Sequence, residues 1–130
     1  MQEPCQPNQI ALTFPAEERY MLVSRMTLSG MGALMGLDID LIGDLRTASD
    51  ECCDCLMHQA LRVRAIRLEA HCCEQKRLHV SFRCVWSDTP GDATPLDLDV
   101  TRGILETLMP EVRIVTDEHG VCEIVFSMPL

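Results

Sequence analysis

Apolar residues recur along the chain with two spacings, one typical of strands and one typical of helices. Five short runs have an alternating or continuous apolar pattern that predicts β-strands, at residues 10–14, 63–73, 78–85, 112–115 and 121–126. Three longer stretches have the three- and four-residue spacing of helices, at residues 17–34, 38–58 and 97–109. The order β-α-α-β-β-α-β-β indicates an α+β fold, a two-layer sandwich with helices on one face of a mixed β-sheet.

The helix predicted at residues 38–58 has the clearest pattern, and Asp38 or Asp40 can cap its start. Its expected core face consists of Ile42, Leu45, Ser49, Cys52 and Leu56. The adjacent face carries Asp44, Thr47, Glu51, Cys55 and His58. In the helix predicted at residues 17–34, Leu22, Met26 and Leu34 recur at helical spacing. Between the third strand and the third helix, residues 87–95 are rich in Ser, Thr, Pro, Gly and Asp and predict a loop.

The length of 130 residues fits one domain, spanning residues 1–130 with a loose start at residues 1–9. The N-terminus has neither a basic segment nor an apolar segment of the kind that makes a signal peptide, and no apolar run reaches about 18 residues. We therefore expect a cytoplasmic protein that does not span a membrane. In that compartment the eight cysteines are expected to be mostly small buried hydrophobic residues, because a disulfide framework needs an oxidising environment.

The charge balance narrows the class of partner. Twenty acidic and eleven basic residues give a net charge of −9. This field repels a polyanion, so direct binding to nucleic acid is not expected. A basic protein segment would be attracted.

Three segments, in the right order, share a pattern with one known family. The first is Thr-Phe-Pro-Ala-Glu at residues 13–17, followed by Leu-Ser-Gly at 28–30 and Met-Gly-Leu at 35–37. The second, at residues 44–58, is similar to a helix with the pattern Glu-x-x-x-Asn-x-x-His, in which Glu51 and His58 match and Cys55 takes the Asn position. The third is Glu-Thr-Leu-Met-Pro-Glu-Val at residues 106–112. Together they resemble the anti-sigma-factor serine/threonine kinases of the GHKL ATPase superfamily.

The resemblance implies the GHKL, or Bergerat-type, ATPase fold and a set of nucleotide-binding positions. Glu51 would be the catalytic carboxylate, Cys55 and the adjacent Asp54 would lie near the metal, and His58 would end the motif. A thiol is a poor ligand for Mg²⁺, which prefers oxygen. The adenine-reading position falls near Asp88, and the phosphate-binding glycines fall on Asp99 and Thr101, with Gly103 out of register. We expect the Asp99 carboxylate to cap its helix and repel a triphosphate, so that binding of Mg-ATP or ADP is weakened or lost.

By the same resemblance, the protein regulates transcription by partner switching. Its partners would be a sigma factor or an anti-anti-sigma-like protein, and it would act as a homodimer. One alternative is an active ATP-dependent serine/threonine kinase that uses Glu51. A second is a metal-binding regulatory module, because the chain holds several thiols and imidazoles suited to Zn²⁺. The candidate metal ligands are Cys52, Cys55, His58, His71, Cys72, Cys73 and Cys84.

Overall fold

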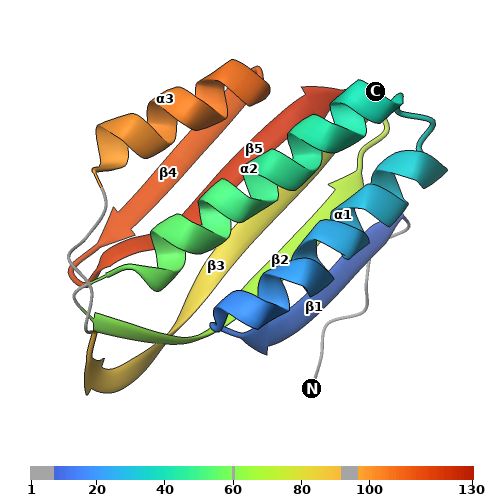
Figure 1. Ribbon diagram of the computed structural model, residues 1–130. Coiled ribbons are helices and arrows are strands. Elements are labelled where there is room, and N and C mark those ends of the chain that lie inside the picture. The colour runs from blue at the N-terminus through green and yellow to red at the C-terminus, as the bar shows by residue number, and fades with distance from the viewer. Residues whose placement is uncertain (1–7, 60, 92–96) are drawn as a thin grey trace.

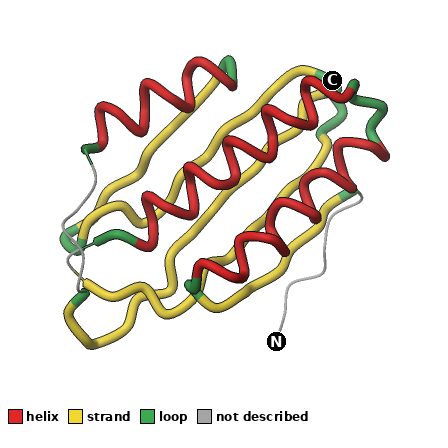
Figure 2. The backbone as a smooth tube through the Cα atoms, viewed as in Figure 1, coloured by secondary structure: helices red, strands yellow, loops and turns green. Residues whose placement is uncertain are grey.

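The computed structural model describes residues 8–59, 61–91 and 97–130. Its elements are β1 (Gln9–Pro15), a 3-10 turn (Glu18–Tyr20), α1 (Met21–Leu34), α2 (Ile39–Met57), β2 (Leu61–Cys72), β3 (Arg77–Pro90), α3 (Leu98–Leu108), β4 (Glu111–Asp117) and β5 (Gly120–Pro129). They follow the predicted order, and the three helices form one layer over a single sheet (Figures 1 and 2). The predicted α+β two-layer sandwich is therefore confirmed. No helix in these ranges is long and apolar enough to cross a membrane.

The sheet has the strand order β1-β2-β3-β5-β4, and each of its four neighbouring pairs is antiparallel. The sequence-based expectation of a mixed sheet is wrong in this respect. Strands β3 and β4, which the helix α3 connects, do run in the same direction. However, β5 lies between them and pairs antiparallel with both, so the parallel contact that would make the sheet mixed does not form.

The core fills the space between the two layers and is mainly aliphatic. On α2, the expected core residues Leu45, Ser49, Cys52 and Leu56 are buried, whereas Ile42 is only half-buried. The Asp38 carboxylate caps this helix, accepting the Leu41 N–H at 2.9 Å. The largest fully buried side chains are Phe82, Phe126, Leu28, Met31, Leu45, Leu56, Ile66, Leu68, Leu78, Leu105, Met109 and Ile124.

Helix α1 is apolar on both its inner and its outer face. Met21, Ser24, Leu28 and Met31 face the core. The three residues whose spacing predicts this helix do not: Leu22, Met26 and Leu34 are 55%, 60% and 80% exposed. Because apolar residues occupy both the inner and the outer face, their periodicity predicts a helix without telling which face is buried.

The described cysteines all carry free thiols, and four of them lie in the core: Cys52, Cys53, Cys55 and Cys84. This confirms the expectation of small buried hydrophobic residues for those four, while Cys5 lies outside the described residues. Burial raises the pKa of the Cys53 and Cys84 thiols to about 12. Thiols with such a pKa stay protonated at neutral pH and are poor nucleophiles.

The predicted loop at residues 87–95 begins later than expected. Strand β3 continues to Pro90, because Pro90 still pairs with Leu61 of β2 after two irregularities in the register. The turn residues Ser87, Asp88 and Thr89 are thus part of an extended, largely exposed end of the strand. Residues 92–95 of the expected loop, and most of the loose start at residues 1–9, lie outside the described residues.

Candidate functional site

The seam between α2 and α3 brings together three of the residues that the sequence singled out. Glu51 and Cys55 lie one turn apart on α2, and the buried side chain of Thr101 reaches them from α3. The Thr101 hydroxyl interacts with both the Glu51 carboxylate and the Cys55 thiol. The residue spacing on each helix and the contact between the helices therefore create one small polar cluster.

The environment of this cluster favours neutral side chains. Burial, reinforced by the charge of Asp54, raises the pKa of the Glu51 carboxyl, and the interaction with Thr101 opposes only part of the rise. Burial also raises the pKa of the Cys55 thiol to about 11, and the nearby Glu51 charge adds to the effect. Cys55 is 2% exposed. The position that the resemblance assigns to a metal-binding amide thus holds a buried, protonated thiol, which offers Mg²⁺ no oxygen.

The raised pKa of Glu51 leads to a test by stability. A carboxyl whose folded-state pKa is raised destabilises the fold when it is ionised, so stability falls as pH rises through its ordinary pKa toward the folded value. We expect Glu51→Gln to raise the urea midpoint at pH 7 and to leave it unchanged at pH 3, where the carboxyl is protonated in both states. Glu106→Gln, at an exposed position of α3, is the matched control. A Glu51→Gln protein that is less stable than wild type at pH 7 would contradict the assignment.

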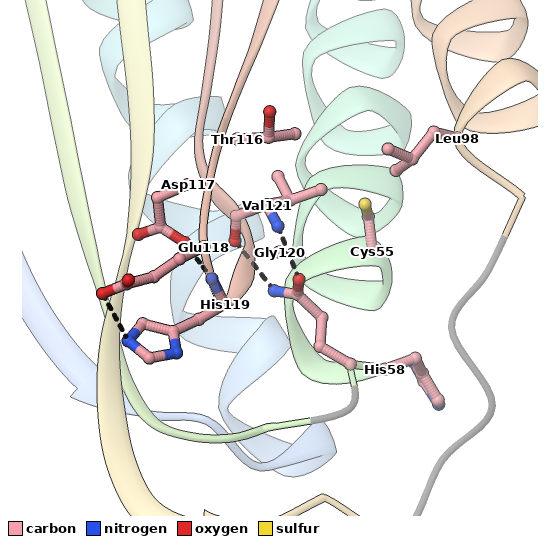
Figure 3. Close-up of a pocket in the computed structure, with 10 residues that line it drawn as sticks. Cys55, His58, Leu98, Thr116, Asp117, Glu118, His119, Gly120 and Val121 are labelled. Atoms are coloured by element: carbon pink, nitrogen blue, oxygen red, sulfur yellow. Dashed lines mark hydrogen bonds and ion pairs between the residues drawn. The ribbon is translucent and has the colours of Figure 1, made fainter.

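A cavity of about 380 Å³ opens beyond the last turn of α2. It is lined by Cys55, His58 and Gln59, by Leu98 at the start of α3, and by residues 116–121 of the turn between β4 and β5. Figure 3 shows Cys55 and Leu98 on one side of the cavity and Thr116 and Val121 on the other. Its volume lies within the range of small-molecule pockets.

Gln59 fixes the wall of this cavity, and nothing in the sequence pattern marked it. Its side chain is buried between β3 and the start of β5, where it takes the place of a strand partner. The Gln59 Oε1 accepts the Val121 N–H at 2.8 Å, and its Nε2 donates to the Val121 carbonyl at 2.9 Å. Nε2 also donates to the Leu56 carbonyl at 3.1 Å, which ties the end of α2 to β5.

The turn at residues 116–121 is the other wall that the sequence did not identify as part of a site. The residue types in it, Asp, Glu, His and Gly, predict a hairpin turn and nothing more. In the structure Asp117 Oδ1 accepts the His119 N–H at 2.8 Å and closes the turn. The His119 ring contacts the Trp86 ring, with their centroids 5.8 Å apart. Asp117 and Glu118 are two acidic residues among those that line the cavity, and Glu118 Oε1 lies 3.3 Å from His119 Nε2.

Asp54 lies on a different side of α2 from the cluster at Thr101, whereas His58 lines the cavity together with Cys55. The charges that act on Asp54 come from His58, Asp50 and Glu18, so its carboxyl faces the start of the α1 region. Burial raises the pKa of the Asp54 carboxyl, and the neighbouring His58 opposes the rise. His58 Nδ1 donates to the Asp54 carbonyl oxygen at 2.6 Å. Successive residues of an α-helix point about 100° apart, so the Asp54 side chain points away from the position of Cys55.

The remaining candidates do not join the cavity. Asp88 is exposed on the far end of β3, Asp99 is exposed in the first turn of α3, and Gly103 lies in the middle of that helix. The expectation that Asp99 caps α3 is wrong: the cap is Asp97, whose carboxylate accepts the Asp99 N–H at 2.9 Å. The helix begins one residue after Asp97, which leaves Asp99 inside the first turn.

Several residues at this site oppose the binding of Mg-ATP. A nucleotide of this kind needs an oxygen ligand for the metal and free N–H groups at a helix start for the phosphates. Here the metal position is the buried Cys55 thiol, and the Asp97 carboxylate already occupies an N–H at the start of α3. Two further carboxylates, Asp117 and Glu118, line the cavity and would repel a triphosphate.

The thiols and imidazoles give no support to a metal centre. Cys52 and Cys55 are both buried thiols of α2, 0% and 2% exposed. Within residues 8–59, 61–91 and 97–130, no group of three or more His, Cys, Asp or Glu side chains is placed to hold a metal ion.

Comparison with known proteins rests on structure, because no family model matches the sequence and no curated protein matches it. Among solved structures, the chain is similar to the crystal structure of the RsbU and RsbW domains of Rv1364c from Mycobacterium tuberculosis, with a TM-score of 0.72 and 17% sequence identity. The match covers 94% of this chain but 32% of that chain, so this chain spans about a third of that protein's length. At this identity the likeness establishes a shared fold: nearly the whole chain adopts the fold of one part of that two-domain structure.

Proposed function

We propose that the protein is a cytoplasmic regulator of transcription that acts by binding protein partners, as anti-sigma factors do, and that its binding of nucleotide is weakened or lost. The observation that carries the proposal is the state of the Cys55 position within a fold shared with an RsbW-containing structure. A buried thiol there opposes Mg²⁺ binding and leaves the fold and its outer surfaces intact. A chain with this combination retains what a binding protein needs and lacks what a kinase needs.

The proposed partners are a sigma factor and an anti-anti-sigma-like protein. The resemblance in three sequence segments and the shared fold both support this class of partner. The net charge of −9 favours a basic segment on the partner and disfavours direct contact with nucleic acid. The homodimer that the resemblance implies is part of the proposal, and light scattering after size-exclusion chromatography tests it.

The test of the function is co-elution with candidate partners. The purified chain is mixed with each sigma factor and each anti-anti-sigma protein encoded in its own genome, with and without Mg-ATP. We expect a complex with at least one of them whose affinity does not depend on nucleotide. Failure to bind any of them would reject the proposal, and a complex that forms only with Mg-ATP would reject the claim of a degenerate site.

A single substitution at the metal position should not restore nucleotide binding. Cys55→Asn supplies the amide that the resemblance places there, but the Asp97 cap and the two carboxylates at the cavity remain. We expect no detectable binding of millimolar Mg-ATP to this variant by calorimetry. Cys53→Ser, which changes a second buried thiol of α2, is the control for nonspecific loss of structure. Micromolar binding by Cys55→Asn alone would show that Cys55 is the one obstacle.

An active serine/threonine kinase is the second candidate, and Glu51 is the observation that favours it. Its raised pKa and its place on α2 suit a carboxylate that accepts a proton. A phosphate-affinity gel of the anti-anti-sigma candidates, incubated with Mg-ATP and the protein, decides between the two. Phosphorylation that Glu51→Gln abolishes would establish the kinase. We expect no phosphorylation with wild type.

A further inference from the structure

Helix α1 presents an uncharged apolar stripe to the solvent. Leu22, Val23 and Met26 are 55%, 42% and 60% exposed, and Leu34 at the end of the helix is 80% exposed. The residues that complete this face between Met26 and Leu34 are Gly30 and Ala33, both exposed. Solvent faces of helices in such a layer are normally polar. A contiguous apolar face is instead typical of a surface that another protein covers.

The stripe is also accessible and long enough for a helical partner. Figure 1 shows α1 at one border of the helix layer, with α2 on one side of it and no helix on the other. From Leu22 to Leu34 the stripe extends over thirteen residues, or about 18 Å along the helix axis. Ile39, at the start of the next helix, is 84% exposed. A partner helix of about thirteen residues would cover the stripe along its whole length.

Acidic groups flank the stripe at both ends. Before α1, Glu18 is exposed, and the charge of Glu17 is balanced by Arg19, whose Nε lies 3.1 Å from it. After α1, Asp38 and Asp40 are both exposed. The face thus has an uncharged apolar centre and a net negative charge at each end. These features suit a helix with one apolar face and Lys or Arg near both of its ends.

A second copy of this chain fits the stripe poorly. Two α1 helices that pack against each other, in either direction, would bring acidic ends against acidic ends. Like charges placed together at an interface oppose association. Anionic membrane lipids would be repelled by the same groups.

From this charge pattern we infer that the outer face of α1 is the docking site for a basic amphipathic helix of the partner protein. The inference deepens the proposed function, because it names the surface of this chain and the chemistry of the segment that binds it. It does not depend on the state of the nucleotide site, whose residues Glu51, Cys55 and Thr101 lie between α2 and α3.

A synthetic peptide tests the surface without knowledge of the partner. The probe is a fluorescent helical peptide of about 18 residues, or five turns, with Leu on one face and Lys on the others. A second peptide replaces each Lys with Glu. We expect micromolar binding of the Lys peptide and at least tenfold weaker binding of the Glu peptide. Raising NaCl from about 0.1 M to about 1 M should weaken the Lys peptide severalfold, because the screening length falls from about 10 Å to about 3 Å.

Two variants locate the site. The double substitution L22S/M26S removes the apolar side chains that are exposed at the centre and start of the stripe. V100S makes the same kind of change at Val100, which is 57% exposed on α3. We expect L22S/M26S to lose at least about tenfold in affinity for the Lys peptide, roughly the loss expected for two buried anchor side chains. V100S should bind like wild type, and all three proteins should share one melting temperature.

Other outcomes would overturn the inference. Equal binding of the two peptides, or equal loss in V100S, would mean that no specific basic-helix site exists on α1. A wild-type dimer that L22S/M26S converts to a monomer would mean that a second copy covers the stripe. Binding of wild type to phosphatidylglycerol vesicles that L22S/M26S abolishes would mean that a membrane does. If the Lys peptide binds as expected but no sigma or anti-anti-sigma protein does, the surface stands and the proposed function fails.

Discussion

Replacing Gln59 with alanine is expected to destabilise the fold by about 3 kcal/mol, because it leaves the buried Val121 N–H unpaired and leaves the Val121 carbonyl with only the weak thiol donor of Cys84, at 3.4 Å. The side chain forms hydrogen bonds with both the Val121 N–H and the Val121 carbonyl, and it links them to the end of α2. The backbone pairing of β3 with β5 ends at Arg83 and Glu123, so the backbone of β3 does not replace these bonds. The loss should appear as a lower urea midpoint and a lower melting temperature.

The control for this prediction is Gln75→Ala, which removes an exposed glutamine from the turn between β2 and β3. It should change stability by less than about 0.5 kcal/mol, as surface substitutions usually do. Gln59→Glu separates the two hydrogen bonds, because a carboxylate accepts the Val121 N–H but donates nothing to its carbonyl. We expect it to destabilise as well. A Gln59→Ala protein within about 0.5 kcal/mol of wild type would contradict the role given to this side chain.

Replacing Gly120 with alanine is the second large effect, also expected to cost about 3 kcal/mol. Gly120 has a φ of 132°, a region that residues with a Cβ rarely adopt, and this alone costs about 1–3 kcal/mol. In addition, a Cβ at this position would lie 2.5 Å from Gln59 Oε1. The new methyl group must therefore displace the amide that holds Val121.

The shared contact makes the two substitutions non-additive. In a Gln59→Ala background the steric conflict is absent, so Gly120→Ala should cost only the backbone part of its effect. Gly103→Ala is the matched control, since a Cβ there meets nothing within 4 Å and the residue lies in an exposed helix position. It should stabilise the protein by up to about 1 kcal/mol. Strictly additive effects of Gln59→Ala and Gly120→Ala would argue against the contact.

The roles of Gln59 and Gly120 are not predictable from the local sequence pattern. Periodicity was sufficient to predict all eight regular elements and the layer architecture, because the strand and helix spacings are local. It did not predict that β5 would lie between β3 and β4, since pairing partners far apart in sequence leave no local signal. It also gave no reason to single out Gln59, whose role depends on Val121, 62 residues away.

The candidate site was predictable to a similar degree. The positions of Glu51, Cys55 and Thr101 came from a resemblance, and the structure places the three side chains together. Asp88 and Gly103 came from the same resemblance by counting along the chain, and both lie away from the cavity. The capping residue of α3 was misplaced by two residues, because Asp97 and Asp99 offer the same chemistry and only the backbone geometry distinguishes them.

Calorimetric titration of the purified protein with Mg-ATP, with Mg-ADP alongside, tests the central claim most directly. The buried thiol at Cys55, the Asp97 cap and the carboxylates at the cavity together predict no detectable heat and no thermal shift at millimolar nucleotide. Binding in the micromolar range would contradict the account, and the protein would then have to be treated as an ATP-dependent kinase.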